Sequence, residues 1–120
     1  MEAYLGENIP KLGFGLMRLP KVNDEKDAPV DVEQVKALVD EFIARGFTYF
    51  DTAWMYCNFK SECAVKEFLV DRYPRDSFTL TTKLHSHYME TKDDRDRIFN
   101  RQKSFCLINR QCLNLIKLVV

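Results

Sequence analysis

Three side chains that can exchange or stabilise protons stand in two short runs of this sequence. The run TYFDTAWMY carries Asp51 and Tyr56, and the run TLTTK ends at Lys83. A phenol has a reference pKa of about 10, so on its own it is a poor acid at neutral pH. A nearby ammonium group favours the phenolate, and a carboxylate can hold that ammonium group in place. These residue types therefore predict a tyrosine that donates a proton with help from a lysine and an aspartate.

The spacing indicates that Asp51 and Lys83 lie at the ends of neighbouring parallel strands. They are 83 − 51 = 32 positions apart, which fits a strand-helix-strand crossover of about 30 residues. Parallel neighbours end side by side, and this is the edge where (β/α)₈ barrels carry their active sites. Taken singly, each residue also has an ordinary interpretation, as a turn-capping aspartate, a packed tyrosine or a solvated lysine.

Strand and helix patterns alternate along the chain and predict an α/β fold with a parallel sheet. Asp31 is suited to cap a helix that continues at helical spacing to Ile43 and stops at Gly46. A second helix is expected to start with Ser61 as its N-cap and to end before Pro74. The expected strands are residues 12–19, 47–53 and 78–84; a hairpin is expected at 1–10, a loop at 22–29 and a third helix at 91–102, with Asp93 and Asp94 in its first turn.

The order of these motifs resembles the aldo-keto reductase family. Asp51-Thr-Ala-x-x-Tyr56 and the later Lys83 match the family's catalytic Asp, Tyr and Lys, while residues 9–20 and 46–51 look like its first two strands. The resemblance implies the N-terminal part, about three βα units, of a (β/α)₈ TIM barrel. It also implies hydride transfer from NADPH to a small carbonyl substrate. Tyr56 would donate the proton, Lys83 would ease its transfer, and Asp51 would orient Lys83 and help position the nicotinamide end of the cofactor.

The resemblance covers only part of such a barrel. A (β/α)₈ barrel takes about 250 residues, and this chain has 120. The family's catalytic His lies on the fourth strand and its main cofactor-binding loops lie near the seventh and eighth, beyond the resemblance. We therefore expect the truncated chain to be inactive alone. One alternative is a non-enzymatic fragment that self-associates or binds a partner through exposed strand edges. Another is a reductase completed by a second polypeptide.

Residues 103–120 differ in character from the rest of the chain. They contain no Asp, Glu, Gly, Pro or Ala. We interpret residues 1–102 as the barrel portion and residues 103–120 as a divergent tail. A frameshift near codon 102 is the favoured explanation of that tail, and a short native helix is the alternative.

Four further residues near the predicted site have weaker signals. His85 and His87 are expected in the loop after the third strand, where they could line the mouth of the site or, less favourably, replace the family's His. Trp54 and Phe59 flank Tyr56, and relatives often use aromatic residues there to shape a substrate pocket, although packing explains them equally well. Gly13-x-Gly15 is not interpreted as a dinucleotide-binding loop, because the third glycine of that motif is absent. Glu62 and Lys66 are four residues apart on the expected helix and are interpreted as a surface ion pair.

The composition excludes several classes of protein. Lys+Arg 18 and Asp+Glu 18 balance, which favours neither nucleic acid nor an anionic membrane as partner. No apolar run is long enough to span a bilayer, and the start lacks a signal-peptide pattern, so a cytoplasmic location is expected. The cysteines are spaced too widely for a typical zinc site, so we expect no metal and four free thiols. The iron–sulfur module of some bacterial relatives also has a different spacing. The cysteines are Cys57, Cys63, Cys106 and Cys112.

Overall fold

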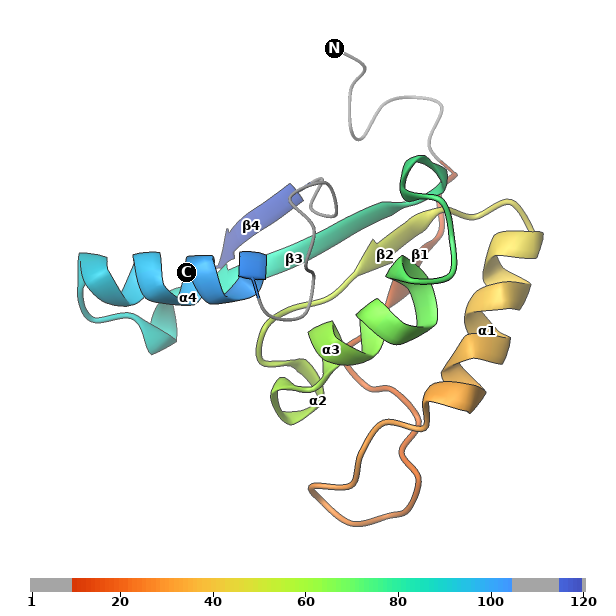
Figure 1. The fold of residues 1–120 in the computed structure, drawn as a ribbon, viewed down its shortest axis with the longest axis horizontal. Coiled ribbons are helices and arrows are strands. Elements are labelled where there is room, and N and C mark those ends of the chain that lie inside the picture. The colour runs from red at the N-terminus through yellow and green to blue at the C-terminus, as the bar shows by residue number, and fades with distance from the viewer. Residues whose placement is uncertain (1–9, 105–114, 120) are drawn as a thin grey trace.

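The computed structural model describes residues 10–104 and 115–119. Within this part of the chain, four parallel strands form one sheet in the order β1-β2-β3-β4 (Figure 1). Gly15 lies beside Asp51 and Asp51 beside Thr81 in the register. Sequential parallel strands with helical crossovers are the construction of a barrel wall, which confirms the expected α/β class. The strands are β1 (Gly13–Gly15), β2 (Tyr49–Asp51), β3 (Thr79–His85) and β4 (Leu115–Val119).

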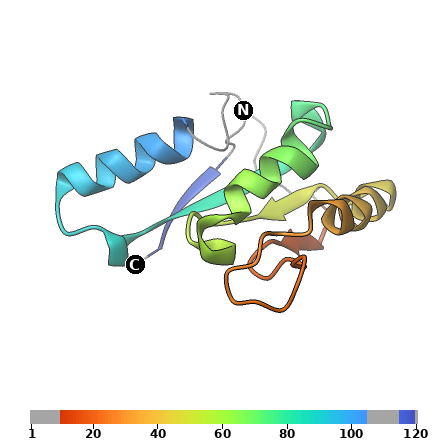
Figure 2. The same ribbon diagram turned by 60° about the horizontal axis from the view of Figure 1, so that its bottom comes forward.

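Helices connect these strands and lie against one face of the sheet. Figure 2 shows α1 and α3 on the same side of the strands. The connection from β2 to β3 is irregular, because α3 passes directly into a π-helical turn, η1. The helical elements are α1 (Val32–Ala44), α2 (Tyr56–Phe59), α3 (Ser61–Val65), η1 (Lys66–Val70), η2 (Arg75–Ser77), η3 (Ser86–Tyr88) and α4 (Lys92–Ser104).

The core lies between the sheet and these helices. Phe50 in β2 is fully buried, and its ring centre lies 5.3 Å from that of Phe42 and 5.7 Å from that of Phe14. Alternation along a strand sends residues on either side of Phe50 to the opposite face. The other buried core residues are Leu16, Leu19, Val35, Val39, Ala64, Val65, Phe68, Leu69, Phe78 and Leu80.

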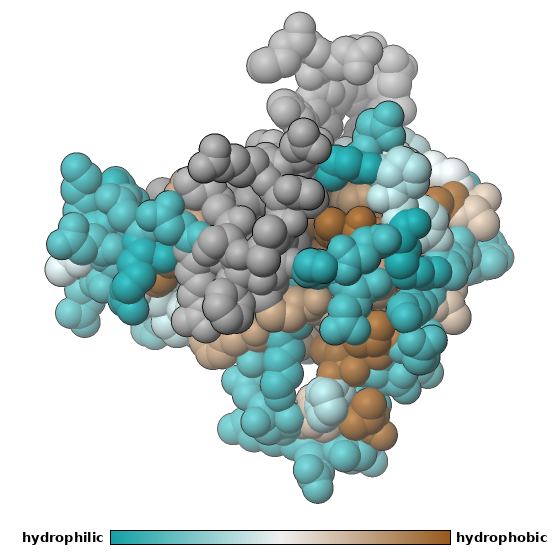
Figure 3. All heavy atoms as spheres, in the orientation of Figure 1, coloured by the Kyte–Doolittle hydropathy of each residue, from teal (hydrophilic) through white to brown (hydrophobic). Residues whose placement is uncertain are grey.

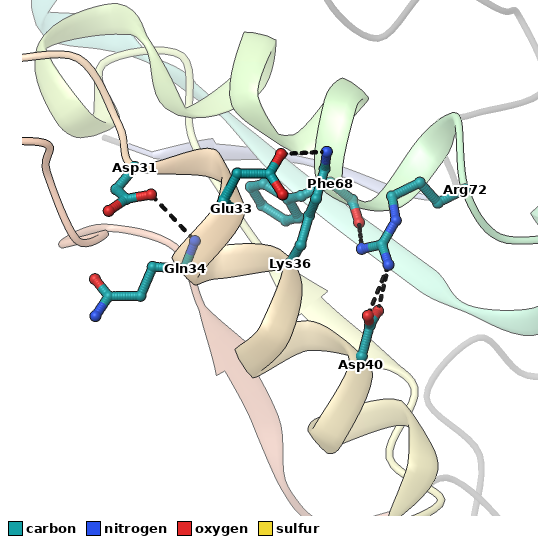
Figure 4. Close-up of polar contacts among 7 residues, drawn as sticks. All are labelled: Asp31, Glu33, Gln34, Lys36, Asp40, Phe68 and Arg72. Atoms are coloured by element: carbon teal, nitrogen blue, oxygen red, sulfur yellow. Dashed lines mark hydrogen bonds and ion pairs between the residues drawn. The ribbon is translucent and has the colours of Figure 1, made fainter.

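Polar contacts join α1 to the end of η1 at the rim of this core (Figure 4). Arg72 Nη2 donates to both carboxylate oxygens of Asp40 at 2.7 Å, and Arg72 Nη1 donates to the carbonyl oxygen of Phe68 at 3.0 Å. The hydrogen bond from Arg72, with a second from Tyr73, lowers the pKa of the Asp40 carboxyl group. At the other end of α1, Asp31 Oδ1 accepts from Gln34 N at 3.1 Å, so the predicted N-cap is confirmed.

Several expected elements differ in detail. The first strand is confined to Gly13–Gly15 within the expected 12–19. Ser61 does not cap the second helix, because Lys60 holds the N-cap position and the Ser61 hydroxyl is buried in other contacts. The third helix begins as expected, with Thr91 Oγ1 accepting from Asp94 N at 3.1 Å. The hairpin expected at 1–10 lies almost wholly outside the described residues.

Part of the segment interpreted as a divergent tail, residues 103–120, belongs to the sheet. Residues 115–119 form β4, which pairs in parallel with β3 from Thr81 to His85. Neither sequence interpretation of residues 103–120 includes a strand. The helix that precedes this segment in the chain, α4, consists mostly of hydrophilic residues (Figure 3). Ile98 anchors α4, with 4% of its surface exposed. Among the described residues, no helix combines the length and apolar character needed to cross a bilayer.

Candidate active site

Asp51 and Lys83 meet at the carboxyl ends of β2 and β3. In the register Asp51 pairs with Thr81, two residues before Lys83, so all three share the face of the sheet opposite Phe50 and the helices. Lys83 Nζ lies 2.5 Å from Asp51 Oδ2. The side chains expose only 16% and 29% of their surface, respectively. The sequence-predicted pair is therefore formed, in a place partly shielded from water.

Tyr56 completes the predicted trio. It is the first residue of α2, directly after the loop that leaves β2, and it is half-buried. Lys83 Nζ lies 4.7 Å from the centre of the Tyr56 ring. At that distance the ammonium charge acts directly on the phenol. The structure thus brings together the carboxylate, amine and phenol that the sequence pattern places at two strand ends.

Hydrogen bonding keeps the Lys83 side chain charged despite its burial. Burial alone lowers the pKa of the Lys83 ammonium group, but hydrogen bonds to Asp51 and Tyr56, together with their charges, outweigh it and raise the pKa above its ordinary value. Nζ also donates to the carbonyl oxygen of Thr52 at 3.0 Å. Lys83 therefore acts as a fixed positive charge at neutral pH. A fixed ammonium group can stabilise negative charge on a neighbouring oxygen.

An unusual turn follows Tyr56. Cys57, Asn58 and Phe59 all have positive φ values, of 53°, 53° and 64°. A non-glycine residue in this left-handed region costs about 1–2 kcal/mol. Contacts with the loop before α1 hold the turn, because Asn58 Nδ2 and Lys60 Nζ both donate to Asp27 Oδ1. These two donors lower the pKa of the Asp27 carboxyl group, with Lys60 contributing most.

Three aromatic rings stand beside this turn. The ring centre of Trp54 lies 4.8 Å from that of Phe59 and 5.3 Å from that of Tyr88, in edge-to-face arrangements. Phe59 and Tyr88 expose 44% and 39% of their surface. The three rings form an open apolar surface at the turn that follows Tyr56. Trp54 and Phe59 were predicted to lie near the site, whereas Tyr88 was missed, since it comes from the separate segment η3 and has no distinctive sequence context.

The two histidines lie in different elements, β3 and η3. His87 lies in η3, is exposed, and packs its ring 5.2 Å from that of Tyr88. His85 is the last residue of β3, which corrects its expected position in the following loop. His87 therefore packs against the ring of Tyr88.

A cavity of about 340 Å³ adjoins the left-handed turn on the side of β1. Three of its lining residues are cationic, and Cys57 and Asn58 line it as well. Cys57 Sγ donates to the carbonyl oxygen of Met17 at 3.5 Å, so the turn and the end of β1 are connected here. Four other lining residues, Met17, Leu19, Ala28 and Val30, are apolar, so the lining is mixed. The cationic residues are Arg18, Lys21 and Lys26.

Two predictions about other polar residues are wrong. Glu62 does not form a surface pair with Lys66, because Glu62 is 4% exposed and accepts from Thr82 Oγ1, while Lys66 Nζ lies 2.6 Å from Asp71 Oδ2. The expectation of four free thiols also fails. Cys57 is a free thiol, but Cys63 is disulfide-bonded. Within residues 10–104 and 115–119, no group of three His, Cys, Asp or Glu side chains is arranged to hold a metal ion.

Comparison with known proteins relates this geometry to one enzyme family. A model of the aldo/keto reductase family matches residues 11–114. The matched range extends beyond residue 102, where the sequence predicts the start of the divergent tail. The frameshift origin of residues 103–120 stays a prediction. Among solved structures, the fold is similar to a thermostable aldo-keto reductase, Tm1743, crystallised with the inhibitor epalrestat, with a TM-score of 0.58 and 24% identity. The similarity covers 82% of this chain but 34% of that one, and shows the fold alone. No curated protein sequence matches.

Proposed function

Because this chain belongs to the aldo/keto reductase family, we propose that it supplies the proton-donating part of a site for NADPH-dependent carbonyl reduction. The observation that carries the proposal is the Asp51–Lys83 pair, 2.5 Å apart, with Lys83 Nζ 4.7 Å from the centre of the Tyr56 ring. A phenol next to a fixed ammonium charge can give its proton to a carbonyl oxygen as that oxygen becomes an alcohol.

Each residue has one role in this proposal. Tyr56 donates the proton to the substrate oxygen. Lys83 stabilises the negative charge that remains on the phenol oxygen. Asp51 holds Lys83 in place and balances its charge. The exposed aromatic surface next to Tyr56 suits an apolar carbonyl compound.

The described residues also fit the end of a nicotinamide cofactor. Asp51 Oδ1 is buried and has no hydrogen-bond partner within the described part of the chain. A buried acceptor of this kind is satisfied by a donor such as a carboxamide group. When bound, the cofactor supplies the hydride, while the protein supplies orientation and charge. The choice of NADPH comes from the family resemblance alone, because the residues that distinguish it from NADH lie beyond that resemblance.

A fluorescence titration of the 120-residue chain with NADPH tests this proposal. Trp54 is the only tryptophan and lies beside the site, so saturable quenching is expected. Asp51→Asn should weaken the binding by about tenfold, since a hydrogen bond to a charged group is worth about 1.5 kcal/mol or more. Exchanging the exposed Asp93 for Asn is the matched control and should change nothing. We expect no turnover from the chain alone, because one proton donor does not make a complete site.

A folded chain that shows no saturable change would contradict the cofactor part of the proposal. Equal binding by wild type and Asp51→Asn would contradict the role given to Asp51. Rapid oxidation of NADPH in the presence of an aromatic aldehyde such as 4-nitrobenzaldehyde would contradict the expected lack of turnover.

A second candidate function is self-association through the sheet edges. The described sheet ends in β1 on one side and β4 on the other, and all of its pairs are parallel. Two copies can pair β4 of each with β1 of the other and thereby close an eight-stranded barrel. Light scattering after size exclusion is expected to give twice the mass of 14.2 kDa. A monomer at micromolar concentration would contradict this candidate.

A further inference from the structure

A second set of polar contacts lies behind the Asp51–Lys83 pair, on the helix-facing side of the sheet. Thr52 follows Asp51 and Thr82 precedes Lys83, so alternation directs these threonines to the opposite face. Both threonines are fully buried. Each meets one of the first two residues of α3. Thr52 Oγ1 lies 2.8 Å from Ser61 Oγ, and Thr82 Oγ1 donates to Glu62 Oε1 at 2.5 Å.

The Ser61 hydroxyl ties the ends of two strands together. Ser61 Oγ donates to the carbonyl oxygen of Leu16 at 3.0 Å, just beyond β1. A hydroxyl has one proton, so the Thr52 hydroxyl must be the donor in its contact with Ser61. Leu16 N donates in turn to the carbonyl oxygen of Asp51 at 2.9 Å. Ser61 therefore contacts the residue that follows Asp51 and the residue whose backbone N–H binds the Asp51 carbonyl oxygen.

Glu62 performs a similar task for β3. It is 4% exposed, and burying a carboxylate is costly unless it is paired or hydrogen-bonded. A surface position next to Lys66 would avoid that cost. The carboxylate instead accepts the Thr82 hydroxyl one residue before Lys83. This hydrogen bond joins the start of α3 to the middle of β3.

We propose that Ser61 and Glu62 are positioning residues for the Asp51–Lys83 pair. They act through Thr52 and Thr82, whose backbones carry the two charged side chains on the opposite face. The two sides are also linked directly, because Lys83 Nζ donates to the carbonyl oxygen of Thr52 at 3.0 Å. The catalytic meaning of this arrangement rests on the proposed function, whereas the effect on Lys83 itself does not.

The test measures the reactivity of the Lys83 amine in two variants of Thr82. Thr82→Val keeps the shape of the side chain but removes the hydroxyl that Glu62 accepts, and Thr82→Ser keeps the hydroxyl. The protein is treated with a limiting amount of acetic anhydride at several pH values between 8 and 11. Peptide mass spectrometry then measures the extent of acetylation of Lys83 relative to that of the exposed Lys11. Thr82→Val should raise the labelling of Lys83 at least about threefold, which corresponds to about half a pKa unit. Thr82→Ser should behave as wild type.

The same measurement on α3 completes the test. Ser61→Ala and Glu62→Gln should both raise Lys83 labelling, while Glu67→Gln, at an exposed position of η1, should not. Circular dichroism identifies the variants that are folded. Unchanged Lys83 labelling in folded Thr82→Val and Ser61→Ala would overturn the proposal, as would an equal response to Glu67→Gln. If Lys83 responds as expected but wild type fails to bind NADPH, the positioning roles stand and the proposed function falls.

Discussion

Replacing Phe50 by alanine is expected to lower the free energy of unfolding by about 3–5 kcal/mol. Phe50 is fully buried in β2, and its ring packs between those of Phe42, Phe14 and Phe78. Truncation leaves a cavity between the central part of the sheet and α1. Domains of this size are often stable by only about 5–15 kcal/mol. A large part of the stability should therefore be lost, and with it the position of the adjacent Asp51.

Urea unfolding followed by circular dichroism measures this effect. Leu38→Ala is the control, because Leu38 lies on α1 with 46% of its surface exposed, and its truncation should change the free energy by no more than about 0.5–1 kcal/mol. Similar losses in the two variants would show that the core is not centred on Phe50. A changed dependence on urea concentration in Phe50→Ala would indicate a less compact native or denatured state.

The sequence predicted the charged pair Asp51 and Lys83 correctly, but it did not predict the roles of Ser61 and Glu62 behind that pair. Asp51 and Lys83 were found because strand ends in a parallel sheet converge, so a spacing along the chain becomes a contact in space. The cap at Asp31 was also predicted, since its partner Gln34 is local. These are the features that depend on short-range geometry or on a regular crossover.

The role of Ser61 could not be predicted in the same way. A serine before an apolar helical run is typical of an N-cap, but its hydroxyl instead contacts Thr52 and Leu16, which lie 9 and 45 positions away. Glu62 misleads for a related reason. Its spacing from Lys66 favours a surface pair, but the packing of α3 against β3 decides which side of the helix is buried. Long-range packing therefore overrides the local pattern.

Irregular backbone was the second source of error. Residues 57–59 are left-handed although none of them is glycine, so the sequence gives no sign of this turn. Contacts with Asp27, which lies in another loop, stabilise it. The π-helical turn η1 likewise continues the apolar spacing expected of a regular helix. The left-handed turn directly follows Tyr56, and η1 follows α3 in the same connection between β2 and β3. Local rules fail here because contacts within the fold, rather than residue preferences, fix the backbone near the site.

Replacing Lys83 by methionine is expected to destabilise the protein in a manner that depends on pH. At pH 7 the change removes the contact with Asp51 Oδ2 and leaves a partly buried carboxylate without its counter-ion. Hydrogen bonds to charged groups are worth about 1.5–3 kcal/mol, so a loss of that size is expected. Lys66→Met is the matched control. The Lys66 and Asp71 side chains expose 37% and 49% of their surface, and breaking such a pair should cost no more than about 1 kcal/mol.

The pH dependence distinguishes a charge effect from a loss of packing. The pKa of Lys83 is raised in the folded protein above its ordinary value of 10.5. The resulting stabilisation is fully present below the pKa of the unfolded chain and disappears as the pH rises through the folded pKa. The stability difference between wild type and Lys83→Met should therefore be constant near pH 8 and shrink above about pH 10.5. A difference of the same size at pH 8 and pH 11.5 would mean that methionine disturbs packing instead, and that the Asp51–Lys83 charge pair contributes little.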